Sequence, residues 1–233
     1  MSGLHLLRLE LDGPRLMRFV NTQYGLGCDD EGFGYALHAW LAAMFGAHAP
    51  KPFRFVEKSY ELMGYTHADA ATLLDHAHAF APAHAFAALM PDSLATKAMP
   101  ASWREGQRLQ IDVLACPVSR KENTEKDVYL RALDLRGDAT PSRAEVYSEW
   151  FRRQWSSTLE FEQLELIGFS RRRLLRRPLI DGHRNSRSIE RPQAAFRAIV
   201  NVVDAKGFST TLARGIGRHR AFGFGMVLLK PAP

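Results

Sequence analysis

Two residues of one short run are suited to proton transfer and hydrogen bonding. Tyr35 and His38 stand three positions apart in the run Tyr-Ala-Leu-His, so a helix would place both on one face. The imidazole of histidine, with an unperturbed pKa near about 6.5, suits acid–base chemistry at neutral pH. The same spacing is also typical of an ordinary amphipathic helix with a boundary tyrosine and histidine, and the run alone leaves both interpretations open.

A second candidate lies near the end of the sequence, where four glycines and three arginines fall within twelve residues. Glycine allows positive φ and close backbone approach, successive N–H groups form an anion site, and arginine matches phosphate oxygens. The loop therefore predicts phosphate binding, with a simple glycine-rich turn between a helix and a strand as the alternative. It matches neither a P-loop nor a dinucleotide fingerprint, because no Lys-Ser or Lys-Thr follows the glycines and a strand comes next. The residues are Arg214, Gly215, Gly217, Arg218, Arg220, Gly223 and Gly225.

A third feature is a strongly basic segment from 170 to 187, which holds seven arginines and one acid, Asp181. Clustered guanidinium groups repel one another, and a polyanion that neutralises them also binds through them. The formal net charge of +6 agrees with a nucleic-acid partner. The alternative is a solvated basic loop, in which Asp181-Gly182 is suited to a hairpin turn. The arginines are Arg171, Arg172, Arg173, Arg176, Arg177, Arg184 and Arg187.

The elements that must position these residues can be read from apolar spacing. In the first half, Leu37, Trp40 and Leu41 recur at helical spacing and predict that this side of the helix faces the core. Gly13-Pro14 ends the first strand, and a polar, glycine-containing connection precedes the helix. The predicted order is β-α-β-β-α-β, with strands at 4–11, 52–58, 60–66 and 94–103 and helices at 33–45 and 69–80.

The second half shows a looser version of the same order. Its charged stretch 122–127 is expected to be a loop. The predicted strands are 108–118, 159–169, 197–203 and 224–229, and the predicted helices are 143–155 and 206–214. The two halves together predict an α+β fold of two tandem ferredoxin-like (RRM-like) βαββαβ domains. Domain 1–104 would carry the helix with His38, and domain 105–233 the arginine segment and the glycine loop.

The amino-acid composition indicates which class of protein the chain belongs to. With 233 residues, 46% hydrophobic and 24% charged, the chain is typical of a globular protein. Its two cysteines, Cys28 and Cys116, are too few and too far apart for a zinc site or a disulfide framework. No cluster of acids and histidines has metal-ligand spacing, so neither a metal nor another cofactor is expected. No apolar run reaches about 18 residues and no secretory signal is visible, which predicts a cytoplasmic protein without a membrane partner.

Three motifs together resemble one known family. They are the first strand leading to Tyr-x-Leu-His, the strand Phe53-Arg54-Phe55-Val56-Glu57, and the terminal Gly-Ile-Gly-x-x-x-x-x-Gly-x-Gly loop. In this combination the chain resembles, over nearly its whole length, the CRISPR repeat-RNA processing endoribonucleases of the CasE type. The terminal loop is the most specific of the three motifs.

The resemblance implies metal-independent cleavage of precursor CRISPR RNA at the foot of the repeat stem-loop. It implies that His38 and Tyr35 are catalytic, and that the partners are this stem-loop and other subunits of a CRISPR effector complex. The chemistry suits these residues, because RNA carries its own nucleophile, the 2′-OH. Its attack on the phosphorus leaves a 2′,3′-cyclic phosphate and a 5′-OH.

Two other functions remain open at this stage. A non-catalytic tandem RNA-binding protein would keep the basic segment and the glycine loop, while Tyr35 and His38 would only pack or stack. A type IV CRISPR processing enzyme would cleave RNA with arginines in place of histidine. The candidates for that role are Arg8, Arg18, Arg214, Arg218 and Arg220.

Overall fold

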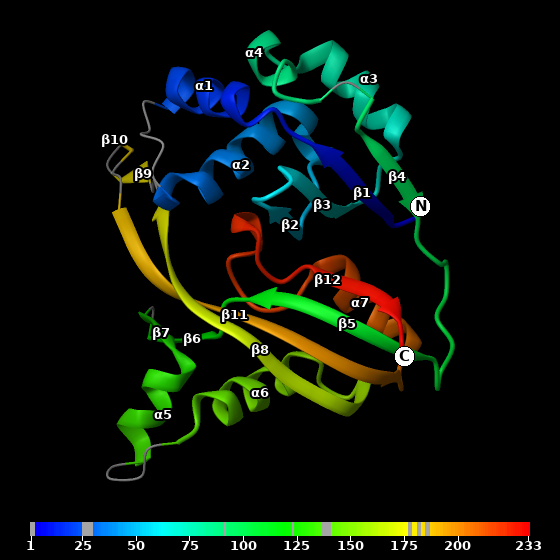
Figure 1. The fold of residues 1–233 in the computed structure, drawn as a ribbon, viewed down its shortest axis with the longest axis vertical. Helices are drawn as coiled ribbons and strands as arrows, with labels where there is room; N and C mark the ends of the chain where they lie inside the picture. The colour runs from blue at the N-terminus through cyan, green and yellow to red at the C-terminus, as the bar shows by residue number, and fades with distance from the viewer. Residues whose placement is uncertain are drawn as a thin grey trace. The chain divides into compact units, whose positions relative to one another are not determined.

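The chain forms two compact units in the computed structural model (Figure 1). The structure describes residues 3–24, 30–90, 92–122, 124–136, 141–176, 179–180, 183–184 and 187–233. Unit 1 comprises Met1–Ala101, Arg173–Ile189 and Ala221–Gly223, and unit 2 comprises Ser102–Arg172, Glu190–Arg220 and Phe224–Pro233. None of the described helices is both long and apolar enough to cross a membrane.

Unit 1 is built on a four-stranded antiparallel sheet in the order β2-β3-β1-β4. The register pairs His5 with Thr66 and Glu10 with Glu61 across β1 and β3. Leu7 and Leu9 of β1 are fully buried and share one core with the helices. The elements are β1 (His5–Glu10), α1 (Gly13–Tyr24), α2 (Asp30–Phe45), the 3-10 helix η1 (Gly46–His48), β2 (Phe53–Val56), β3 (Glu61–Thr66), α3 (Ala70–Phe80), α4 (Ala83–Phe86) and β4 (Ala95–Ala98).

Unit 2 contains a second four-stranded sheet, in the order β12-β5-β11-β8 (Figure 1). Helix α6 packs on it through Phe151, whose ring stacks on Phe196 of β11 at 4.4 Å between centroids. Ser142 caps this helix by accepting a hydrogen bond from the Glu145 N–H. The elements are β5 (Arg108–Ala115), β6 (Val118–Lys121), β7 (Thr124–Asp127), α5 (Val128–Arg136), α6 (Arg143–Gln154), β8 (Leu159–Arg176), β9 (Leu179–Ile180), β10 (His183–Arg184), β11 (Arg187–Val202), α7 (Ala205–Arg214), η2 (Arg220–Phe222) and β12 (Val227–Pro231).

Both sheets follow one topology, because β2-β3-β1-β4 and β12-β5-β11-β8 each place the first and third strands of a βαββαβ unit at the centre. The predicted fold of two tandem ferredoxin-like units is therefore confirmed.

Two local predictions were wrong. Helix α1 follows the first strand, since Leu16, Phe19 and Val20 form a buried helical stripe and Pro14 suits the first turn of a helix. The stretch 122–127 is not a loop, because Thr124–Asp127 forms β7 and pairs with β6 around a turn at Glu122, whose φ is +48°.

Candidate active site and nucleic-acid interface

Helix α2 positions the two candidate catalytic residues. Leu37, Trp40 and Leu41 are buried on its core side, as the sequence predicts. The Trp40 indole N–H also donates a 2.9 Å hydrogen bond to the Ala85 carbonyl, which fixes the rotation of the helix against α4. His38 is exposed and Tyr35 is half-buried. The helix thus presents His38 to solvent from a rigid, well-packed element.

Phe222 lies beside His38 in unit 1, with ring centroids 6.4 Å apart. Phe222 also packs near the buried Gly34, where a Cβ would lie 3.6 Å from it, in ordinary van der Waals contact. No sequence pattern predicted Phe222 as a neighbour of His38, although a glycine inside a helical pattern can have a packing reason. Gly223 follows with φ +87°, and a Cβ added there would lie 3.6 Å from the ring of Phe53.

The surroundings of His38 favour its neutral form. Partial loss of solvent around the imidazole is the main cause that lowers the pKa of His38, and the positive charge of Lys51 lowers it further. A histidine with a lowered pKa is neutral at pH 7 and able to accept a proton. This state is the one that a general base requires.

The glycine loop has the backbone conformation that its glycines predict. φ is +72° at Gly215, +68° at Gly217, +87° at Gly223 and +77° at Gly225. Gly225 is buried, donates its N–H to the Leu114 carbonyl at 2.7 Å and accepts from the Ile216 N–H at 2.9 Å. A Cβ at Gly225 would overlap the Ile216 carbonyl oxygen. For this glycine the structure supports the alternative of a turn that serves the fold of unit 2.

Glu125 holds the same loop from β7. Its carboxylate pairs with Arg218, lies 3.0 Å from Nε2 of His219, and accepts a hydrogen bond from Arg191 at 3.1 Å. The side chains of Glu125 and His219 are only 7% and 1% exposed. No local sequence pattern predicts the role of Glu125, because its partners lie 66 to 94 positions away in the chain.

Charge governs the ionisation of Glu125. Its burial alone would raise the pKa, but the hydrogen bond from Arg218 and the positive charges of His219 and Arg218 outweigh it and lower the pKa of Glu125 to about 2. The carboxylate is therefore ionised throughout the physiological range, and it ties β7 to the loop by charge-assisted hydrogen bonds.

Arg214 and Arg220 lie near each other at the end of α7 and in η2. Arg220 donates a 2.6 Å hydrogen bond to the Arg214 carbonyl. Burial first, and then the charges of Arg214 and Arg218, lower the pKa of Arg220. Within the described part of the chain, no carboxylate pairs with Arg214 or Arg220. An incoming anion would relieve this repulsion.

The arginine segment is in part a β-hairpin. Strands β8 and β11 extend into it, and β9 pairs with β10. Arg171 pairs with Glu190 at 3.1 Å, Arg172 is half-buried and Arg173 is exposed. Arg177 lies outside the described residues. Arg176, Arg184 and Arg187 belong to strands, but their side chains also lie outside what the structure describes.

Comparisons with known proteins decide the family. A model of the CRISPR-associated protein family matches residues 4–231. The chain belongs to this family. A sequence search of characterised proteins gave no significant match.

Solved structures share the fold of this CRISPR-associated protein. The CRISPR endoribonuclease Cse3 bound to a 19-nucleotide RNA superposes with a TM-score of 0.63 at 17% identity, covering 98% of this chain and 100% of that chain. The CRISPR-associated protein Cas6e from Escherichia coli K-12 gives 0.55 at 14% identity, with the same coverage. A chain of a CRISPR RNA-guided surveillance complex gives 0.58 at 16% identity, again with that coverage.

Proposed function

We propose that this CRISPR-associated protein is a metal-independent endoribonuclease that cleaves precursor CRISPR RNA within its repeats and gives mature guide RNA. The observation that carries the proposal is His38, an exposed histidine with a lowered pKa on a rigid helix. It stands in a chain of the CRISPR-associated family whose fold is that of a CRISPR endoribonuclease bound to RNA.

His38 is the general base of the proposed reaction. Its neutral imidazole takes the proton of the ribose 2′-OH, the 2′-oxygen forms a bond to phosphorus, and the bond from phosphorus to the 5′-oxygen breaks. A proton passes to the leaving 5′-oxygen from the imidazolium or from water. The products are a 2′,3′-cyclic phosphate and a 5′-OH. No metal-activated water is needed, because the substrate supplies the nucleophile.

Tyr35 has a supporting role in this proposal. It lies one helical turn before His38 and is half-buried, so its ring is held while its hydroxyl can reach a ribose or phosphate oxygen. Lys51, whose charge acts on His38, adds positive charge where the phosphorane forms. Arg8 is a weaker candidate for such a role, since it pairs with Glu61 at 3.0 Å.

The arginines bind the RNA backbone in our proposal, and the glycines shape the loop beside them. Arg214, with no described carboxylate partner, is the most available of them, and Arg173 is exposed. Gly225 is left to the fold for the reasons given above. The remaining RNA-binding residues are Arg171, Arg172, Arg176, Arg177, Arg184, Arg218, Arg220, Gly215, Gly217 and Gly223.

The two proposed roles fall on the two domains that the sequence predicts. We assign catalysis to a domain 1–104 and RNA gripping to a domain 105–233, and we infer that the product stays bound to the repeat stem-loop. One chain of the same fold belongs to a CRISPR RNA-guided surveillance complex, which supports a role as a subunit of an effector complex. The cytoplasm, where such RNA is made, is the inferred location.

The test is incubation of the purified protein with repeat RNA in EDTA, followed by analysis of the product ends. We expect cleavage in EDTA, with a 2′,3′-cyclic phosphate and a 5′-OH. Cleavage that requires magnesium would contradict the mechanism. Tight binding of repeat RNA without any cleavage would point instead to a non-catalytic RNA-binding protein.

A further inference from the structure

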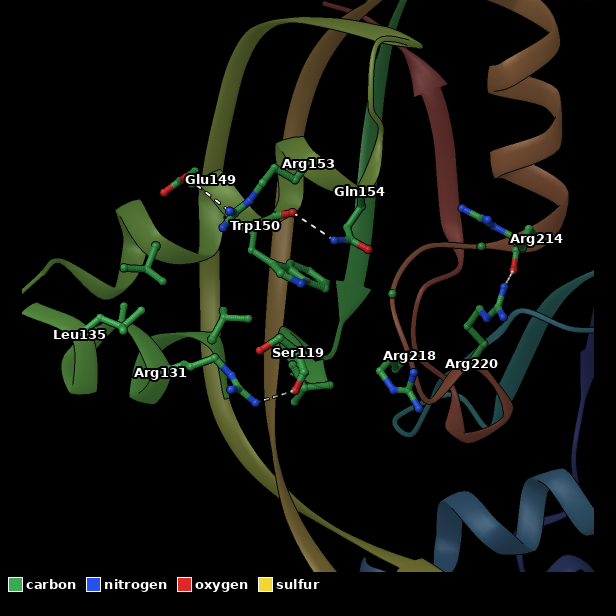
Figure 2. A pocket seen from close by; sticks show the side chains of 16 residues that line it. Ser119, Arg131, Leu135, Glu149, Trp150, Arg153, Gln154, Arg214, Arg218 and Arg220 are labelled. Carbon is green, nitrogen blue, oxygen red and sulfur yellow. Dashed lines mark hydrogen bonds and ion pairs between the residues drawn. The ribbon is translucent and has the colours of Figure 1, made fainter. Parts of the chain in front are cut away.

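Unit 2 contains a pocket of about 780 Å³ between α5, α6, β6 and the glycine loop (Figure 2). This volume falls in the range of about 300–1,000 Å³ that is usual for small-molecule sites. The pocket contains neither His38 nor Tyr35. The sequence patterns did not predict it, because its walls come from four separate segments of the chain.

The two ends of the pocket differ in chemistry. Arg214, Arg218 and Arg220 gather at one end, and Figure 2 shows them on one side of the Trp150 indole. The other end lies between α5 and α6, where Val128 and Val146 add apolar surface. A ligand that fits this layout has an anionic group joined to a flat or apolar body.

Two buried polar atoms of the lining have no hydrogen-bond partner among the residues that the structure describes. They are Oγ of Ser119 and Nε of Arg131. The guanidinium of Arg131 is held beside Ser119 by a 3.4 Å hydrogen bond to its carbonyl oxygen. A buried polar atom without a partner costs free energy. A ligand with hydrogen-bonding groups would remove this cost at both atoms, whereas a purely apolar ligand would not.

Positively charged side chains also line the pocket away from the glycine loop. Arg153 lines the wall on α6 and is only loosely paired with Glu149, at 3.7 Å. At the loop end, burial first and then the positive charges of Arg214 and Arg218 lower the pKa of Arg220. A phosphate would satisfy the loop end, and a base would bring its polar edge to Ser119 and Arg131.

We propose that this pocket binds a nucleotide, with the phosphate at Arg214 and Arg220 and the base toward Ser119 and Arg131. The nucleotide is either free or an unpaired residue of an RNA. In the second case the inference rests on the function proposed above, because the RNA would be the repeat transcript.

Calorimetric titration of the full-length protein with the four nucleoside monophosphates, without any RNA, tests the proposal. We expect saturable binding of at least one of them, and affinities at least about tenfold weaker for inorganic phosphate and for the matching nucleoside. Equal affinity for phosphate would show a plain anion site and overturn the proposal. Binding of an acidic peptide but of no nucleotide would also overturn it and indicate a protein-docking groove.

Three variants test where in the pocket the nucleotide binds. Ser119→Ala removes a buried hydroxyl that has no partner among the described residues, so it should not lower the melting temperature, and it should weaken nucleotide binding several-fold. Arg153→Gln should also weaken it, whereas Arg152→Gln is the matched control, because the Arg152 guanidinium lies over the Phe161 ring at 5.0 Å. Ala132→Trp should fill the pocket and abolish binding. Parental affinity in a folded Ala132→Trp protein would overturn the assignment.

A final experiment distinguishes a free nucleotide from an unpaired RNA residue as the ligand. RNA stem-loops with and without single-stranded flanks are compared by gel shift on the parent and on Arg153→Gln. A loss of affinity confined to the flanked RNA identifies an unpaired RNA residue, and no loss on either RNA identifies a free nucleotide. Nucleotide binding should survive in His38→Ala, so a failure of the cleavage mechanism leaves this result readable.

Discussion

The histidine of α2 and the histidine of the glycine loop have opposite surroundings. His38 is exposed, lies next to Phe222, and has a lowered pKa through partial burial and the charge of Lys51. His219 is buried and lies 3.0 Å from the carboxylate of Glu125. The first is neutral and open to a substrate, while the second is part of a charged cluster that fixes a loop.

The comparison teaches that residue type alone does not identify a catalytic group. Both histidines stand in motifs that carry the family resemblance. Only their environments separate a side chain that is available for proton transfer from one that stabilises the fold. Substitutions at the two places should therefore move different quantities, the cleavage rate in one and the free energy of unfolding in the other.

The largest effect is expected at His38. His38→Ala should lower single-turnover cleavage of repeat RNA by roughly 10²–10⁴-fold, because an acid–base group is lost, with little change in RNA affinity or melting temperature. Tyr35→Phe should cost less. His48→Ala is the matched control, since His48 is another exposed histidine of unit 1. Cleavage by His38→Ala at the parental rate would remove histidine from the mechanism and favour arginine-based cleavage.

Gly225→Ala should affect stability instead. The new Cβ would meet the Ile216 carbonyl at a positive φ, so we expect a loss of about 2–5 kcal/mol in the free energy of unfolding. Gly106→Ala is the control, because φ is +76° there too, but nothing lies within 4 Å of the added Cβ. Urea unfolding measures both. Equal stabilities of the two variants would contradict the close contact, and weaker RNA binding per folded Gly225→Ala molecule would restore a ligand-gripping role.

Glu125→Gln should also destabilise unit 2, by about 2–3 kcal/mol at pH 7, because charge-assisted hydrogen bonds are lost. The folded pKa of about 2 lies below the unfolded value, so the ionised form stabilises the fold at neutral pH. That stability is lost as the pH falls from about 4.5 toward 2. The difference in the free energy of unfolding between parent and variant should therefore be smaller at pH 3 than at pH 7. Glu122→Gln, an exposed neighbour, should behave like the parent at both pH values.

The part of these sites that the sequence predicts is local. The stripe of Leu37, Trp40 and Leu41 predicts the helix and the face that carries His38, and the four glycines predict positive φ. Glu125 could not be predicted, since its partners are distant in the chain and it falls in a charged stretch that looks like a loop. Helix α1 was not predicted, because Gly13-Pro14 indicates the end of the first strand. The same pair also begins a helix, since proline suits the first helical turn.

The arginine segment gives the next effect in size. Each arginine that contacts a phosphate contributes about one unit to the slope of log affinity against log salt. Changing Arg171, Arg172 and Arg173 together to alanine should flatten that slope by up to about three units and weaken binding. The control removes the same charge through Lys58, Lys97 and Lys206, which are exposed elsewhere. Equal slopes in parent and triple variant would make the segment a solvated hairpin.

The smallest effect concerns the pH profile. In the proposed mechanism the neutral form of His38 is the active one, so the cleavage rate should rise with pH through the pKa of His38, with a midpoint below about 6.5. Lys51→Met removes the charge that lowers this pKa, so the midpoint should move up. It should stay below about 6.5, since partial burial is the larger cause and remains. Lys58→Met, an exposed control, should leave the midpoint in place. The quantity to compare is the pH midpoint of the rate profile and not the maximal rate. Lys51 can also stabilise the phosphorane, so Lys51→Met can lower the maximal rate for a separate reason. An unmoved or lowered midpoint would mean that Lys51 does not act on His38 in solution.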